Sequence, residues 1–162
     1  MQEVSHEHWM RVALDYARTA GAQGEVPIGA VLVRDGHVLA GAYNLRETWQ
    51  DPTAHAELLA IQQASRQLGG WRLTNCDLYV TLEPCPMCAG AAVLSRIRHI
   101  YYGASDPKGG ALESKLNLLA PGLWNHLPEV SSGILAEECG MILKDFFRDL
   151  RGKSAFQTWR DV

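Results

Sequence analysis

The sequence has no long run of apolar residues, no internal repeat and no segment of low complexity among its 162 residues. None of its apolar runs reaches the roughly 18 residues expected of a membrane-spanning helix. The first residues, MQEVSHEHWMRVALDYA, lack the basic start and the continuous apolar stretch of a secretory signal peptide. We therefore expect a cytoplasmic protein with no membrane association.

Excess positive charge is also absent, since 15 Lys and Arg residues face 18 Asp and Glu residues and the net charge is −3. This balance excludes binding of nucleic acid through overall charge, so any nucleic-acid site has to be local. Cysteines are few, with four in the chain. Because cytoplasmic thiols are kept reduced, a disulfide framework is not expected, and these residues need another role.

Apolar spacing and turn residues predict the first elements of the fold. A helix follows Ser5, and two antiparallel strands lie on either side of the turn at Asp35-Gly36. A second helix runs from His55 to about Leu68, with its cap supplied by the turn at residues 51–53. The later elements, in chain order, are a strand at 76–84, a helix at 87–96, a strand at 97–103, a long surface loop with one helical turn at 104–128 and a helix capped by Ser131 or Ser132.

This order of elements predicts an α/β fold. A strand hairpin followed by two strand-helix units gives a three-layer α/β/α sandwich around a central mixed sheet. Residues 1–152 form a single domain in this interpretation, and residues 153–162 form a C-terminal tail. Sites in such folds lie at the carboxyl ends of strands, where helices begin.

The segment Cys85-Pro86-Met87-Cys88 lies at one of these strand-to-helix turns. Two thiolates at this spacing can bind one metal ion, but a redox-active dithiol has the same spacing. The pair alone therefore leaves a metal site and a thiol oxidoreductase equally open.

His55 favours the metal site, because two thiolates and a neutral imidazole suit Zn²⁺ and leave a fourth, catalytic position open. Glu57 lies beside this residue and is the natural group to accept and pass on a proton. Cys76 and Cys139 do not have the spacing of ligands, and we expect both to be small buried hydrophobic residues.

The run His55-Ala56-Glu57, followed by Pro84-Cys85-x-x-Cys88, resembles the signature of zinc-dependent nucleobase deaminases. More narrowly, the stretches EVPIGAVLV, DPTAHAE, LYVTLEPCPMCAGA and GILAEECGMILKDFFRDLR resemble the bacterial tRNA-specific adenosine deaminase family along nearly the whole chain. The resemblance implies a cytidine deaminase-like fold with a central mixed sheet of five strands, a homodimer and one Zn²⁺ per subunit.

The resemblance also implies roles for individual residues. His55, Cys85 and Cys88 hold zinc, and Glu57 shuttles protons while a zinc-activated water attacks C6 of adenine. Adenosine at the wobble position of tRNA becomes inosine. The backbone amide at Ala56 is expected to assist at the same site.

The same resemblance implies contacts with an anticodon stem-loop and no DNA as natural substrate. Asn44 binds the base, and Asp106 contacts a ribose 2′-hydroxyl, the group that distinguishes RNA from DNA. One of the two adjacent residues Phe146 and Phe147 packs and the other stacks. The remaining implied substrate contacts are Val26 and Pro27 in the pocket wall, His126 after the long loop, and Arg148 and Arg151 on the last helix.

Three rival interpretations remain. The closest is a zinc-dependent deaminase of a free base or nucleotide, such as guanine or cytosine, which the Phe-Phe-Arg segment and Asp106 disfavour. A non-catalytic, zinc-stabilised RNA-binding subunit would lack the carboxylate, whereas Glu57 is present. A thiol oxidoreductase leaves His55 without a role.

Overall fold

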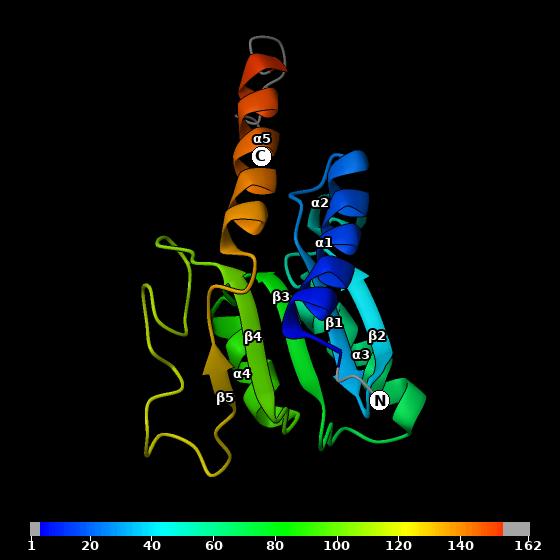
Figure 1. The fold of residues 1–162 in the computed structure, drawn as a ribbon, viewed down its shortest axis with the longest axis vertical. Helices are drawn as coiled ribbons and strands as arrows, with labels where there is room; N and C mark the ends of the chain where they lie inside the picture. Colours follow the sequence, from blue (N-terminus) through cyan, green and yellow to red (C-terminus); the bar gives the residue numbers. More distant parts are fainter. Residues whose placement is uncertain (1–3, 154–162) are drawn as a thin grey trace.

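The structure is a computed structural model that describes residues 4–153. Figure 1 shows a sheet with helices on its faces and one long helix extending beyond it. Residues 154–162, most of the predicted tail, lie outside the described residues. The elements in chain order are α1 (His6–Ala22), β1 (Gly29–Arg34), β2 (His37–Tyr43), α2 (Arg46–Trp49), α3 (Ala56–Leu68), β3 (Asp77–Leu82), α4 (Pro86–Leu94), β4 (His99–Ala104), β5 (Glu129–Ser131) and α5 (Ala136–Lys153).

The sheet has five strands in the order β2-β1-β3-β4-β5. Strand β1 pairs antiparallel with β2 and with β3, whereas β3, β4 and β5 are parallel to one another. Asp35 and Gly36 both have positive φ, at 52° and 75°, which is the backbone of a tight hairpin turn. The predicted mixed five-stranded sheet is therefore confirmed.

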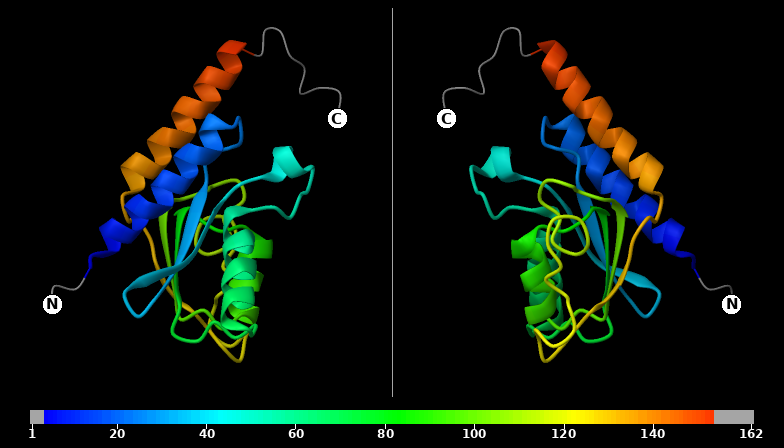
Figure 2. Two further views of the ribbon diagram at one scale, coloured as in Figure 1. Left: turned by 90° about the vertical axis from the view of Figure 1, so that its right-hand side faces the viewer. Right: turned by 90° about the vertical axis from the view of Figure 1, so that its left-hand side faces the viewer.

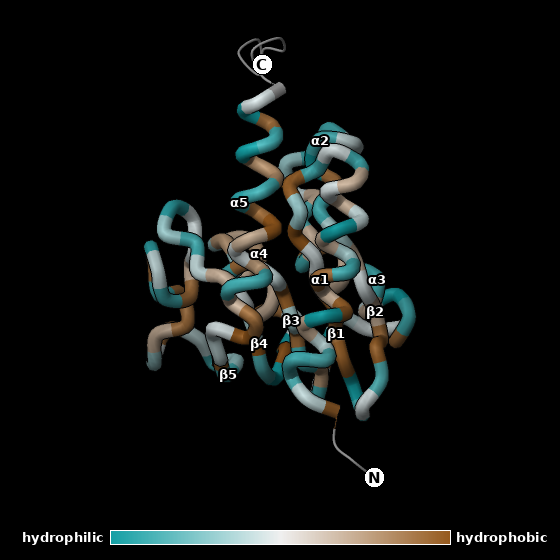
Figure 3. Tube along the Cα trace, turned by 45° about the horizontal axis from the view of Figure 1, so that its top comes forward, coloured by the Kyte–Doolittle hydropathy of each residue, from teal (hydrophilic) through white to brown (hydrophobic). Residues whose placement is uncertain are grey.

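Helices cover both faces of the sheet, which confirms the predicted three-layer sandwich. Figure 2 shows α1 and α5 on one face and α3 and α4 on the other. Each side has its own core of buried apolar side chains, one built from α1 and the start of α5 and one from α3 and α4. Polar and apolar segments alternate along α5 in Figure 3, as expected of a helix with one buried face.

Helix α1 packs unusually close to strand β1. A Cβ atom added at Gly29 would lie 2.0 Å from the backbone oxygen of Ala13 and 2.6 Å from the backbone nitrogen of Ala17. Only glycine fits at this position, because any side chain would collide with the helix backbone. Ser5 begins α1 as predicted, and its side chain accepts a hydrogen bond from the backbone N–H of His8.

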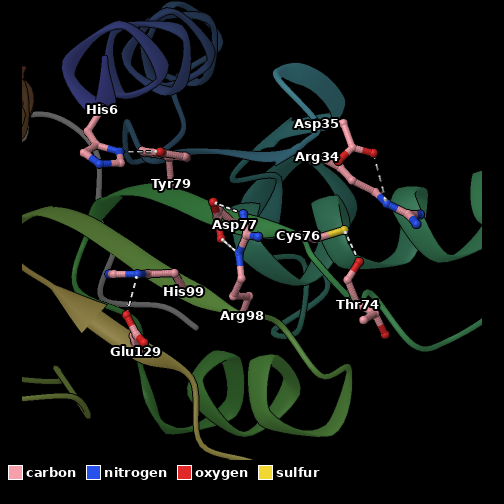
Figure 4. Close-up of polar contacts among 10 residues, drawn as sticks. All are labelled: His6, Arg34, Asp35, Thr74, Cys76, Asp77, Tyr79, Arg98, His99 and Glu129. Carbon is pink, nitrogen blue, oxygen red and sulfur yellow. Dashed lines mark hydrogen bonds and ion pairs between the residues drawn. The ribbon is translucent and has the colours of Figure 1, made fainter. Parts of the chain in front are cut away.

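A stack of aromatic rings lies on the face of the sheet that α1 covers, and Figure 4 shows three of its members, His6, Tyr79 and His99. Tyr101 stacks on Tyr79, His6 and His99, with ring centroids 4.6, 4.3 and 3.9 Å apart. His6 also bonds the hydroxyl of Tyr79 through Nδ1 at 2.7 Å, and His99 contacts Ser131 of β5 at 2.8 Å. These contacts attach α1 and β5 to the centre of the sheet.

Four local predictions were wrong or incomplete. The N-cap of α3 is His55 rather than a residue of 51–53, where Asp51 instead accepts hydrogen bonds from Thr53 within its own turn. Helix α5 begins at Ala136, because Ser131 is part of strand β5. The short elements α2 and β5 were not predicted.

The long loop after β4 also differs from the prediction. Residues 105–128 contain turns but no helix or strand. They do not all lie on the surface, because Ala111, Leu112 and Leu119 are buried against the core on the α3 and α4 side. Across residues 4–153, no helix is long and apolar enough to span a membrane.

Candidate active site

The candidate site lies at the end of the sheet that is formed by the carboxyl ends of β3 and β4. These strands are parallel neighbours, with Leu82 paired to Ala104, so the segments that follow them lie side by side. Cys85 follows β3 and is the N-cap of α4, and His55 is the N-cap of α3. Both residues therefore precede helix starts, where ligand sites in such folds lie.

His55, Cys85 and Cys88 converge at this end of the sheet. The Nδ1 atom of His55 lies 3.6 Å from the Sγ atoms of both cysteines. All three potential ligand atoms lie within 4.8 Å of one another, and among residues 4–153 this is the group of His, Cys and acidic residues that could hold a metal ion. Cys76 and Cys139 are both fully buried outside this group, as predicted.

Local sequence explains how these residues come to face one another. His55 and Cys85 both have extended backbones, with ψ of 149° and 172°, and neither side chain caps its helix. Pro86 occupies the first turn of α4, where its missing N–H costs nothing. Cys88 lies in the same turn and is fully buried. Two side chains that leave the helix starts without capping them can thus meet in the space between α3 and α4.

Hydrogen bonds among the three side chains shift the pKa of each of them. A hydrogen bond from Cys88, together with His55, lowers the pKa of the Cys85 thiol to about 4. The bond to Cys85 in turn raises the pKa of Cys88, and a hydrogen bond to Cys85 raises the pKa of His55. Cys85 is therefore a thiolate at neutral pH, the form in which a cysteine binds a metal ion.

Glu57 lies in the first turn of α3, beside these residues. Its side chain is only 4% exposed, and burial raises the pKa of its carboxyl group. Burial therefore favours the protonated form of this group relative to an exposed carboxyl group. Glu57 lies beside the ligand group, as the sequence predicted.

A cavity of about 470 Å³ opens onto this group. Its floor contains His55, Glu57 and Cys85, and its walls come from the segment before β1, from α2, from the loop after β4 and from α5. The cavity is large enough for a purine base. The residues that line it are Val26, Ile28, Asn44, Arg46, His55, Ala56, Glu57, Leu82, Glu83, Cys85, Ser105, Asp106, Lys108, Leu143 and Phe147.

Comparison with known proteins decides the family. Residues 4–151 match the MafB19-like deaminase family. The chain is also 56% identical over 147 residues to the tRNA-specific adenosine deaminase of Bacillus subtilis (strain 168), with 91% of each chain covered. The chain belongs to the tRNA-specific adenosine deaminases.

Solved structures agree with this membership. The chain is 51% identical to a structure from a study of A-to-I editing by tRNA:A34 deaminases, with a TM-score of 0.81 and coverage of 84% of this chain and 99% of the other. A guanine deaminase from Bacillus subtilis is 28% identical, with a TM-score of 0.60 and coverage of 96% and 99%. The greater similarity is therefore to the tRNA deaminase.

Several residues to which the tRNA deaminase resemblance assigned substrate contacts line the cavity. Asn44 is buried, donates a hydrogen bond to the Val26 carbonyl at 3.3 Å and accepts one from the Arg46 N–H at 3.2 Å. Asp106 accepts hydrogen bonds from the N–H groups of Lys108 and Gly109. Val26, Ala56 and Phe147 also lie in the cavity wall.

The aromatic and basic side chains of α5 lie in different surroundings. Phe147 is 41% exposed at the cavity, and Phe146 is half-buried with its ring set edgewise against Phe147. This arrangement agrees with the expectation that one ring packs and the other is available for stacking. Arg151 lies outside the cavity in an adjoining groove of about 380 Å³, which is lined by Lys108, Leu143, Lys144, Phe147 and Arg151.

Besides Arg151, three other predicted contact residues do not line the cavity. Pro27 is buried behind it, against Gly21 of α1. Arg148 forms ion pairs with Asp145 and Asp149 along α5. His126 bonds the carbonyl of Ile97 at 2.7 Å, at the amino end of β4 and hence at the other end of the sheet.

Sequence reasoning assigned no role to three charged side chains at the cavity, those of Glu83, Arg46 and Lys108. Glu83 is the most unusual, because its carboxylate is only 2% exposed. Burial alone would raise its pKa, but hydrogen bonds from Ser114, Glu113 and Asp106 lower it below the ordinary value. The only sequence signal was a charged residue at the end of an apolar strand, directly before Pro84.

Proposed function

We propose that the protein deaminates adenosine to inosine at the wobble position of tRNA by hydrolysis. The observation that carries this proposal is one cavity lined by His55, Glu57 and Cys85, with Cys88 in contact with His55, and also by Phe147 of α5. The first four residues supply deaminase chemistry. The aromatic and basic helix beside them suits an RNA loop better than a free base.

We further propose that one Zn²⁺ per subunit is held by His55, Cys85 and Cys88. Two sulfur atoms and one imidazole nitrogen are ligands that Zn²⁺ prefers in catalytic sites. Zn–S and Zn–N bonds of ordinary length at a tetrahedral angle separate sulfur from nitrogen by about 3.5 Å, which agrees with the observed 3.6 Å. When bound, the ion supplies Lewis-acid activation of a water molecule.

Glu57 moves the protons in this proposal. Its carboxylate takes one proton from the attacking water and passes it to N1 of the adenine ring as the oxygen adds to C6. It then transfers the remaining proton of that oxygen to the amino group, which leaves as ammonia. The C6 oxygen that stays makes the product inosine. The buried position of Glu57, with its raised pKa, suits a group that is protonated and deprotonated in one cycle.

The cavity wall provides the contacts that hold the substrate. Asn44 can bind the base edge, and the backbone N–H of Ala56 lies at the start of α3, where helix N–H groups are free to donate. Asp106 is placed to accept a hydrogen bond from the ribose 2′-hydroxyl, which DNA lacks. Phe147 offers a stacking surface for a neighbouring base.

A local basic surface next to the cavity supports a nucleic-acid substrate despite the net negative charge. Lys108, Lys144 and Arg151 surround Phe147 in the adjoining groove. Arg148 extends the basic character of α5, although its own ion pairs with Asp145 and Asp149 weaken its share. These side chains can contact phosphates on either side of the edited nucleotide.

The rival function is deamination of a free base such as guanine or cytosine, which the shared fold of guanine deaminases favours. The decisive experiment measures inosine in an anticodon stem-loop RNA with adenosine at the wobble position, beside free adenosine, adenine, guanine and cytosine. We expect product only in the stem-loop. Turnover of a free base alone would keep the zinc chemistry but overturn the tRNA substrate.

We also propose a homodimer, because the surface carries large exposed apolar side chains on the side of the sheet covered by α3 and α4. Trp71 and Leu94 are 52% and 62% exposed there. Light scattering during gel filtration tests this proposal, and a monomeric mass at micromolar concentration would contradict it.

A tRNA substrate is also the reason to propose a cytoplasmic location. Residues 1–152 would then act as one catalytic domain.

A further inference from the structure

The carboxylate of Glu83 collects hydrogen bonds from two parts of the loop after β4. Its Oε1 atom accepts from the backbone N–H of Asp106 at 3.1 Å and from the hydroxyl of Ser114. Its Oε2 atom accepts from the backbone N–H groups of Leu112, Glu113 and Ser114 at 3.1, 2.9 and 3.0 Å. One buried side chain thus closes a loop of nine residues, 106–114, into a ring.

The loop is shaped to receive this carboxylate. A Cβ atom added at Gly110 would lie 2.3 to 2.5 Å from the carboxyl atoms of Glu83, so only glycine permits the contact. The backbone N–H of Ala111 donates to the carbonyl of Pro84 at 2.9 Å, and the N–H of Glu83 donates to the carbonyl of Ala104. Backbone and side-chain bonds therefore join the end of β3 to this loop at both ends.

The contact with Asp106 is the one that reaches the cavity. Glu83 holds the backbone nitrogen of Asp106, while the Asp106 side chain folds over its own turn and accepts from Lys108 and Gly109. Both Asp106 and Lys108 line the cavity. Two residues further along the chain from Glu83 is Cys85, which faces His55. Glu83 therefore connects the turn that carries a metal ligand to the turn that carries the ribose contact.

We propose that Glu83 is a positioning residue that fixes Asp106 for recognition of the ribose, without taking part in proton transfer. This inference rests on the proposed function, in which Asp106 contacts the 2′-hydroxyl. A carboxylate with two acceptor oxygens is needed, because its five donors come from both sides. The bonds hold the Asp106 turn rigid before substrate binds, which lowers the entropy lost on binding.

The substitution Glu83→Gln separates the two sets of bonds. A carboxamide oxygen can still accept from the three N–H groups at 112–114, whereas its NH₂ group faces the N–H of Asp106 and cannot accept from it. We expect KM for the stem-loop RNA to rise about tenfold, with kcat within about threefold and zinc content unchanged. The ratio of rates on RNA and on the matched deoxyadenosine substrate should fall.

A double-mutant cycle tests whether Glu83 acts through Asp106. Adding Glu83→Gln to Asp106→Asn should lower the RNA-to-DNA rate ratio no further than Asp106→Asn does alone. An additive loss would overturn the proposal, as would loss of zinc or an equal loss of rate on RNA and DNA in Glu83→Gln. Gly110→Ala should reproduce the effect, and Gly70→Ala, whose added Cβ meets no atom within 4 Å, should not.

Hydrogen exchange tests the positioning role without relying on activity. The amide of Asp106 should exchange faster in Glu83→Gln, while the amides at 112–114 keep most of their protection. Unchanged protection at Asp106 would overturn the proposal even if the enzyme proved to use another substrate. If the wild-type protein made no inosine in RNA, the proposed function would fail, and the exchange result would still decide whether Glu83 holds the turn.

Discussion

The Nδ1 atom of His55 lies 3.6 Å from the Sγ atom of Cys85, although 30 positions separate the two residues in the chain. Each residue is the last one before a helix, and each leaves its helix start uncapped. The protein gives up two side-chain caps, each worth about 1 kcal/mol to a helix. In return, two potential metal ligands are held on two rigid elements.

Replacement of Glu57 should remove activity without removing the site. We expect Glu57→Gln to lower kcat on the stem-loop RNA by about 10³-fold or more, because the carboxamide cannot carry the proton. Zinc content and the melting temperature should stay close to those of the wild type, since Gln has a similar volume and Glu57 is not one of the three ligands. Metal analysis, calorimetry and the inosine assay measure these three quantities. Turnover near the wild-type rate would contradict the assigned role.

Replacement of a ligand should have the opposite pattern. Cys85→Ala should lose most of the bound zinc and lower the melting temperature, because metal-binding free energy is also folding free energy at such a site. Cys76→Ala is the matched control, since Cys76 is buried outside the ligand group. It should keep zinc and cost about 1 kcal/mol or less of stability. Equal zinc content in the two variants would argue against the metal site.

Asp106→Asn should change which sugar is accepted more than how fast the chemistry proceeds. The amide keeps an oxygen for the turn but loses the charged acceptor for the 2′-hydroxyl. We expect the ratio of kcat/KM on RNA to that on the matched deoxyadenosine substrate to fall by about fivefold to tenfold. Zinc content should not change. A ratio equal to that of the wild type would exclude the proposed ribose contact.

The aromatic stack of His6, Tyr79, His99 and Tyr101 predicts a pH dependence of stability. Burial lowers the pKa of His99 below its ordinary value of 6.5, and the nearby groups His6 and Arg98 lower it further. The negative charges of Glu129 and Asp77 act in the opposite direction but are outweighed. A lowered pKa means that the folded state binds the proton less well than the unfolded state. The contribution of His99 to the free energy of unfolding is therefore present above pH 6.5 and is lost as the pH falls through the lowered pKa.

Urea unfolding at pH 7.5 and pH 5.5 measures this contribution. The wild type should lose more free energy of unfolding between these values than His99→Gln does, because the variant has no titrating ring in the stack. His37→Gln provides the control, since His37 is an exposed residue of β2. The same loss in the wild type and in His99→Gln would contradict the prediction.

How far the fold could be predicted depended on how local the signals were. The spacing of apolar residues and the turn at Asp35-Gly36 act within a few residues, and the elements they predicted are present. The strand β5 is only three residues long and pairs with β4 across the loop of residues 105–128. Nothing local to Glu129–Ser131 indicates this pairing, so Ser131 was predicted as a helix cap.

The residues of the site fall into the same two groups, those that local sequence indicates and those that only tertiary packing places. The potential metal ligands His55, Cys85 and Cys88 and the neighbouring Glu57 could be found from spacing, because each motif begins a helix and carries chemically rare side chains. His126 and Pro27 do not line the cavity, because their positions follow from packing at other parts of the chain. Glu83 was missed for the same reason: its donors lie more than twenty residues away.

The sequence by itself determined the chemistry of this protein, since two thiols, an imidazole and a carboxylate at helix starts can be identified from residue type and spacing alone. Only the tertiary structure decided how that chemistry is enclosed. The parallel pairing of β3 with β4 brings Glu83 to Asp106, and the packing of α5 on the sheet brings Phe147 to the cavity. Such contacts join residues that are distant in the chain, and they form because burial of apolar faces fixes how the elements pack.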